Sequence, residues 1–206
     1  MKHIFLPAAA AALLAVAGCE NPADNTTDAK VEEAKPKPAP EVVDGTRYVF
    51  TDNSKIGFVG SKVTGSHEGG FKEFTGHFTI ADGKPVGTDH KVEINLRSTW
   101  ADNPRLARHL KGPDFFDVPR HPMAVFDVTS IEKIDTGYSV TGNLTLHGVT
   151  KSITFPATVS QNGKVAKIKA EFDINRFDWG IAYPGKSDDL IRKEVVLKLD
   201  LEARAE

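Results

Sequence analysis

Alternation of apolar and polar residues with a period of two is the feature that most constrains how this chain folds. Val92, Ile94 and Leu96 alternate with charged or amide side chains, and the ranges 167–175 and 194–202 repeat the pattern. A period of two places apolar side chains on one face of a β-strand and polar ones on the other. Such strands belong to antiparallel sheets that pack on a core on one side and meet water on the other.

Further strand candidates follow one another along most of the chain, separated by turn signals such as Asp82-Gly83 and Asn162-Gly163. They cover Tyr48 to Phe50, Lys55 to Val63, Phe71 to Ile80, Ala124 to Ile131, Tyr138 to His147 and Ser152 to Ser160. About eight strands with so little helix predict an all-β fold, either a sandwich or a closed up-and-down barrel.

One short helix is expected, with Asn103 as its N-cap, Pro104 at its first position and Gly112 just past its end. A helix this short is not stable alone in water, so it must dock on the barrel. It either covers a ligand at the barrel mouth or plugs the barrel with no ligand beneath. The side chains that would face the barrel from this helix and the turn after it are Leu106, His109, Leu110, Phe115 and Phe116.

An eight-stranded barrel either just fills with side chains or leaves room for one small ligand. Six glycines between Gly57 and Gly76 favour room in the lumen, although glycine in a strand equally marks a bulge or a barrel corner. The lumen would be lined by aromatic rings and would suit a hydrocarbon chain. The expected lining residues are Phe58, Phe74, Phe78, Phe126, Phe155 and Phe172.

The N-terminus has the pattern of a signal peptide over residues 1–18. Its apolar run covers residues 4–17, fewer than the roughly 18 that a spanning helix needs. The run ends in small residues before Cys19, the only cysteine of the chain, which also excludes an internal disulfide. This ending resembles the bacterial lipobox and implies that Cys19 carries acyl chains such as palmitate, the alternative being an ordinary signal peptide. Glu20 then favours the outer membrane, on its periplasmic side.

Residues 19–45 are expected to form a disordered tether, because this stretch holds no aromatic residue and four prolines. The folded domain would then be residues 46–206. It contains 22 basic and 21 acidic residues, so it has no basic field for a nucleic acid partner.

Catalytic and metal-binding patterns are not found. The seven histidines show no His-x-x-x-His spacing, so neither a metal nor another cofactor is expected. Asp114 and Asp117 flank the two phenylalanines, but such acids more often cap turns, and no nucleophile or nucleotide-binding motif occurs. The sequence therefore predicts a protein that is not an enzyme.

Several longer segments resemble the YceI-like family. They are Thr99-Trp100-Ala101-Asp102-Asn103, His109 to Val118, Pro122 with Phe126, Gly142 to Lys151, and Arg176-Phe177-Asp178-Trp179-Gly180-Ile181. The resemblance covers nearly all of residues 46–206 and implies an extended, lipocalin-like antiparallel β-barrel. It further implies an apolar tunnel for a polyisoprenoid, an isoprenoid quinone or a fatty-acid derivative, with Trp179 among the site residues.

Together these patterns predict a lipid-anchored periplasmic protein that shields a long-chain amphiphile from water. The alternative is an envelope lipoprotein whose barrel is packed solid and serves as an interaction scaffold. Arg105, Arg108 and Lys111 are the nearest cations on the short helix, and they would contact a headgroup or simply be solvated. The sequence leaves open whether the chain forms a homodimer.

Overall fold

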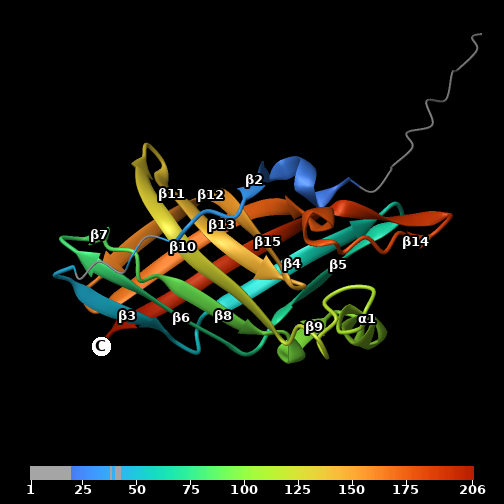
Figure 1. The fold of residues 1–206 in the computed structure, drawn as a ribbon, viewed down its shortest axis with the longest axis horizontal. Helices are drawn as coiled ribbons and strands as arrows, with labels where there is room; N and C mark the ends of the chain where they lie inside the picture. The colour runs from blue at the N-terminus through green and yellow to red at the C-terminus, as the bar shows by residue number, and fades with distance from the viewer. Residues whose placement is uncertain (1–19, 38, 40–42) are drawn as a thin grey trace, which may run out of the picture.

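Eight antiparallel strands form a closed barrel in the computed structural model, which describes residues 20–37, 39 and 43–206 (Figure 1). Around the barrel they are β3 (Thr46–Phe50), β6 (Phe74–Ala81), β8 (Lys91–Asn95), β10 (Met123–Ile134), β11 (Gly137–Leu146), β12 (Val149–Asn162), β13 (Val165–Asn175) and β15 (Asp189–Ala205). The ring closes where β15 pairs with β13 on one edge and with β3 on the other. The predicted all-β barrel of about eight strands is confirmed.

The barrel is extended at one end because β15 is much longer than its neighbour β3. Only Ala203 to Ala205 pair with β3, whereas Ile191 to Asp200 pair with β4 (Lys55–Lys62). From β4 the sheet continues to β5 (Gly65–Phe71) and β9 (Thr99–Ala101). The short elements β7 (Lys84–Pro85), β14 (Gly185–Lys186), η2 (Leu96–Ser98) and η3 (Arg176–Trp179) complete the domain.

The predicted helix is present as α1 (Pro104–Leu110), beside β9 at the extended end (Figure 1). The Asn103 side-chain oxygen accepts hydrogen bonds from the backbone N–H groups of Arg105 and Leu106 at 2.9 and 3.3 Å. Such a cap satisfies donors that the first turn leaves without partners. Leu110 is buried in a cluster with Phe58 of β4, so the helix docks on the barrel as expected.

The segment before the barrel is packed against it rather than disordered. It contains η1 (Pro22–Asn25), β1 (Thr27–Asp28) and β2 (Lys30–Glu33). Strand β12 pairs with β13 only from Thr158 to Asn162; where the two separate, β2 pairs with β12 and β1 with β13. The prediction of a disordered tether over residues 19–45 is therefore wrong for this part. Its low hydrophobicity did not matter, because backbone hydrogen bonds to the two open strand edges hold it.

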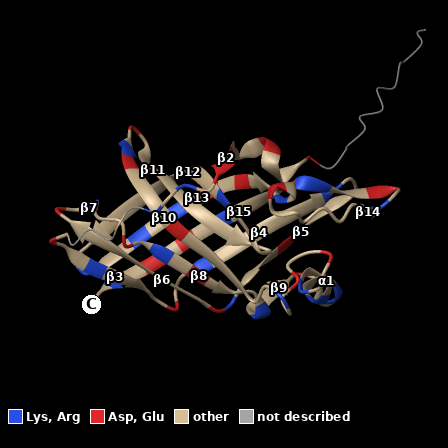
Figure 2. Ribbon diagram, viewed as in Figure 1, with Lys and Arg blue, Asp and Glu red and all other residues tan. Residues whose placement is uncertain are grey.

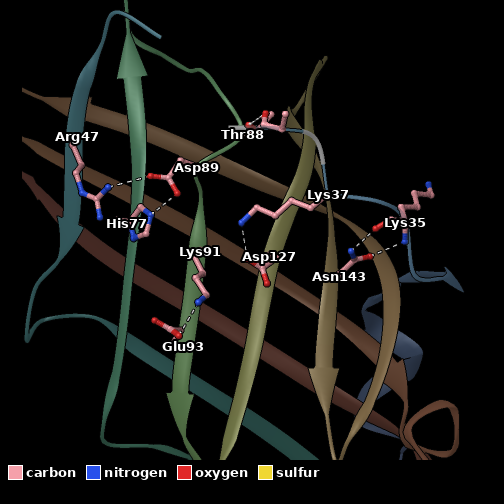
Figure 3. Close-up of polar contacts among 11 residues, drawn as sticks. Lys35, Lys37, Arg47, His77, Thr88, Asp89, Lys91, Glu93, Asp127 and Asn143 are labelled. Atoms are coloured by element: carbon pink, nitrogen blue, oxygen red, sulfur yellow. Dashed lines mark hydrogen bonds and ion pairs between the residues drawn. The ribbon is translucent and has the colours of Figure 1, made fainter. Parts of the chain in front are cut away.

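Side-chain contacts fix this N-terminal strap, by which we mean residues 20–37, along its length. Ala23 packs on Val59 and Val196, and the Thr26 hydroxyl donates to the Asp173 carboxylate at 2.7 Å. Further on, the Lys35 N–H donates to the Asn143 side chain and the Lys35 carbonyl accepts from it, at 2.9 and 2.6 Å (Figure 3). The strap thus crosses from the extended end of the barrel to β11.

Two other predictions from the sequence fall outside what the structure describes. The signal peptide and Cys19 lie in residues 1–19, which are outside the described residues.

None of the helices in the described part of the chain has the length and apolar character needed to cross a bilayer. In the view of Figure 2, Lys and Arg positions are interspersed with Asp and Glu positions along the strands.

Candidate ligand cavity

The barrel encloses a cavity of about 310 Å³ at its extended end. This lies at the lower end of the range of about 300–1,000 Å³ that is usual for small-molecule sites. Apolar side chains from β4, β8, β11, β12, β13 and β15 form most of its wall, and α1 and the turn after it close one side. The barrel is therefore not packed solid. The scaffold alternative required a filled core.

Eight of the site residues predicted from the sequence line this cavity. They are Phe58, Leu106, Leu110, Phe115, Phe116, Phe126, Phe155 and Phe172. Phe155 and Phe172 stack with ring centroids 4.0 Å apart, and Phe58 and Phe116 meet edge to face at 6.3 Å. The helix and the wall strands thus contribute to one continuous apolar surface.

The other four predicted site residues lie elsewhere. Phe78 stacks on Tyr48 in a separate core cluster, and Phe74 packs edge-on against Phe50. His109 faces Asp114 at 2.8 Å on the exposed side of the helix. Trp179 is fully buried, and its indole N–H donates to the Leu144 carbonyl at 3.0 Å, so it supports the cavity wall from behind.

The glycines of the first strands do not all leave empty space. A Cβ at Gly69 would lie 2.3 Å from the Phe58 ring, so the ring occupies the place where a side chain would be. Gly60 differs, because it lines the cavity and a Cβ there would meet no atom within 4 Å. Of the six glycines, Gly60 therefore opens space in the cavity, while Gly69 leaves room for the Phe58 ring of the neighbouring strand.

Sequence reasoning missed four basic residues in the cavity wall, Lys62, His67, Arg176 and Arg192. Lys62 continues the inward-facing series of alternate residues Ile56, Phe58 and Gly60, and this register is the signal that predicts it. By contrast, Arg105, Arg108 and Lys111 of the helix region are absent from the wall.

Arg176 is buried, and its guanidinium donates to four backbone carbonyls, those of Ile181, Tyr183, Ile191 and Arg192. Burial lowers the pKa of this guanidinium from its ordinary value. The side chain thereby holds the loop between η3 and β15 against the cavity.

A larger hollow of about 910 Å³ is more open and has a mixed wall. Its wall includes the exposed ion pairs Lys169–Asp200 at 3.4 Å and Lys198–Glu171 at 3.7 Å. Charged, solvated groups of this kind do not favour an apolar ligand. The smaller, more apolar cavity inside the barrel is therefore the candidate site. No set of His, Cys, Asp and Glu side chains suited to a metal ion occurs among the residues that the structure places.

Comparison with known proteins agrees with this fold. Residues 48–203 match the family model of the YceI-like domain. A UPF0312 protein of Pseudomonas putida is 34% identical over 134 residues, which cover 62% of this chain and 70% of the relative. A UPF0312 protein of Yersinia pestis is 39% identical over 95 residues, which cover 46% of this chain and 50% of the relative.

Two solved structures show the same architecture. The crystal structure of BcnA from Burkholderia cenocepacia has a TM-score of 0.66 at 27% identity and covers 72% of this chain and 95% of that protein. A polyisoprenoid binding domain from Saccharophagus degradans has a TM-score of 0.63 at 16% identity, over 79% of this chain and all of that domain, and shows likeness of fold. The chain belongs to the family of proteins with a YceI-like domain.

Proposed function

We propose that this protein binds a long-chain amphiphile in the barrel cavity and keeps its apolar chain out of water. The observation that carries the proposal is the barrel cavity, whose wall is built mostly from aliphatic and aromatic side chains. A polyisoprenoid, an isoprenoid quinone and a fatty-acid derivative all have a tail of this character. The polyisoprenoid binding domain with the same fold supports this class of ligand.

The cavity wall favours binding over catalysis. Its only hydroxyl belongs to Ser61, and it contains no carboxylate or thiol among the described residues. The Ser61 hydroxyl donates to Asn21 of the strap at 3.3 Å. A general base paired with a nucleophile is what covalent or acid–base chemistry would need.

Burial of the tail supplies enough free energy for useful affinity. Each buried methylene contributes about 0.8 kcal/mol, so ten contribute about 8 kcal/mol before ordering costs, which corresponds to about micromolar binding. The anchor completes the proposal: acylation of Cys19 would hold the barrel at the periplasmic side of the outer membrane, and the packed strap would hold it close to its attachment point.

The test is a series of ligands with one headgroup and increasing chain length, measured by isothermal titration calorimetry on protein stripped of co-purifying lipid. Affinity should rise with each added methylene until the chain exceeds the cavity. Native mass spectrometry of the untreated protein should show a hydrophobic adduct. Affinity that does not change with chain length would contradict the proposal.

A further inference from the structure

The cavity wall is apolar at one end and basic at the other. Each residue in the wall that can carry a charge is basic, namely Lys62, His67, Arg176 and Arg192. Asp and Glu side chains are absent from the same wall among the described residues. A cavity that only kept an apolar tail out of water would not need four basic groups in its wall.

These four residues lie at one end of the cavity. Lys62 is opposite Ile191 in the β4–β15 register, and Arg176 donates to the carbonyls of Ile191 and Arg192. His67 is opposite Gly60, two residues before Lys62. At the other end of the same two strands, Ile56 is opposite Leu199, and the wall is apolar.

Arg176 gives this end of the cavity a buried positive charge. It is 4% exposed, and its guanidinium donates hydrogen bonds to four neutral carbonyl oxygens. The guanidinium also lies over the Phe177 ring, whose centroid is 4.7 Å from the guanidinium carbon. In the described part of the chain no carboxylate forms an ion pair with it. A buried cation without an acidic partner favours an anion nearby.

Lys62 and His67 have acidic partners outside the cavity wall. Lys62 forms an ion pair with Asp189, and the His67 ring lies 2.9 Å from Asp102. The hydrogen bond from Lys62 lowers the pKa of Asp189, which keeps that carboxyl ionised. These pairs orient Lys62 and His67, while Arg176 and Arg192 extend the basic surface across η3 and β15.

We propose that this basic end is a headgroup site, so that the bound amphiphile carries an anionic oxygen headgroup, a carboxylate or a phosphate, with its tail toward Ile56 and Leu199. The inference rests on the proposed function, since it assigns the orientation of a ligand in the same cavity. With such a headgroup site, the cavity would select its ligand by headgroup charge as well as by tail length. Charge-assisted hydrogen bonds are the interactions that would make the difference.

The experiment compares four ligands with a chain of 16 carbons, each below its micelle concentration or solubility limit: hexadecanoate, hexadecyl phosphate, hexadecan-1-ol and hexadecyltrimethylammonium. Calorimetry on the full chain should show both anions binding about tenfold or more tightly than the alcohol, and the ammonium ligand binding worst. The two anions distinguish a carboxylate from a phosphate ligand, and tighter binding of either one supports the headgroup site.

Substitutions assign the effect to this end of the cavity. Arg192→Gln and Lys62→Gln should each weaken anion binding by about tenfold and leave the alcohol within about twofold, whereas Arg192→Lys should restore most of the loss. Arg108→Gln, the same change on α1 outside the cavity wall, should have no effect. A thermal melt checks that each variant is folded, and if one glutamine variant does not fold, the other decides.

The possible failures are distinct. If none of the four ligands binds, the proposed function fails and the headgroup site with it. If all four bind equally, the proposed function stands and the headgroup site is overturned. It is also overturned if the anions bind best but the folded variants match the unchanged protein, because the charge selection then arises elsewhere.

Discussion

Replacement of Gly60 by leucine is expected to fill part of the cavity while leaving the barrel intact. Gly60 lines the cavity in the same inward series as Phe58 and Lys62, and an added Cβ would meet no atom within 4 Å. The new side chain therefore occupies space that the ligand tail would otherwise use. Its backbone φ is not positive, so a side chain causes no strain there.

The size of the effect follows from the carbon atoms displaced. A leucine side chain has four carbons and would exclude about three or four ligand methylenes, each contributing about 0.8 kcal/mol. The loss of about 2.4–3.2 kcal/mol corresponds to about 60- to 200-fold weaker binding of a ligand that fills the cavity. The free energy of unfolding should stay the same or rise by about 0.4–1 kcal/mol, because glycine loses the most conformational entropy on folding.

Calorimetry with the chain-length series and a denaturant titration of the empty protein measure the two quantities. Gly65→Leu is the matched control, since Gly65 belongs to the same hairpin, an added Cβ there also meets nothing within 4 Å, and it is not part of the cavity wall. Short ligands should be affected less than long ones by Gly60→Leu. Unchanged affinity for a long ligand in a folded Gly60→Leu protein would show that the tail does not occupy this cavity.

Three other predictions concern the anchor, the helix and the strap. Cys19→Ala should abolish incorporation of radiolabelled fatty acid, and equal labelling of both proteins would exclude this attachment site. Replacement of both Leu106 and Leu110 by serine should speed ligand release, measured by stopped-flow displacement, while most of the barrel stays folded, because each buried leucine contributes about 1.5–3 kcal/mol to a local unit; global unfolding would place the helix in the main core.

For the strap, burial raises the pKa of the Asp173 carboxyl despite the hydrogen bond from Thr26. The contribution of Asp173 to the stability of the fold is therefore present at low pH and is lost as the pH rises through the raised pKa. Asp173→Asn should therefore raise the melting temperature more at about pH 7 than at about pH 3; the opposite order would show that the ionised form is the stabilising one.

Local sequence determined the strands and the helix because both depend on neighbours in the chain. Alternate residues of a strand point to opposite faces, so the series Val195, Leu197 and Leu199 was assigned to the interior from its spacing alone, and all three line the cavity. The Asn103 cap and Pro104 likewise marked the start of α1, since a cap acts on the first turn after it. The strand pattern alone allowed a sandwich or a barrel, and the resemblance to the YceI-like family predicted the closed barrel.

Tertiary structure alone decided which inward-facing residues share the cavity. Phe58 and Phe78 have the same local pattern, but Phe58 lines the cavity and Phe78 packs on Tyr48 in another cluster, because strand pairing sets their positions along the barrel. The role of Arg176 was equally hidden, because its partners are carbonyls brought together by the folding of the loop before β15.

The N-terminal strap is a further feature that only the tertiary structure decided. Its composition predicted disorder, because it offers few apolar side chains for burial. The separation of β12 from β13 leaves two strand edges whose backbone N–H and C=O groups need partners, and β1 and β2 supply them. Every residue except proline carries the same backbone N–H and C=O groups, so a pairing that they drive has no side-chain pattern by which the sequence could predict it.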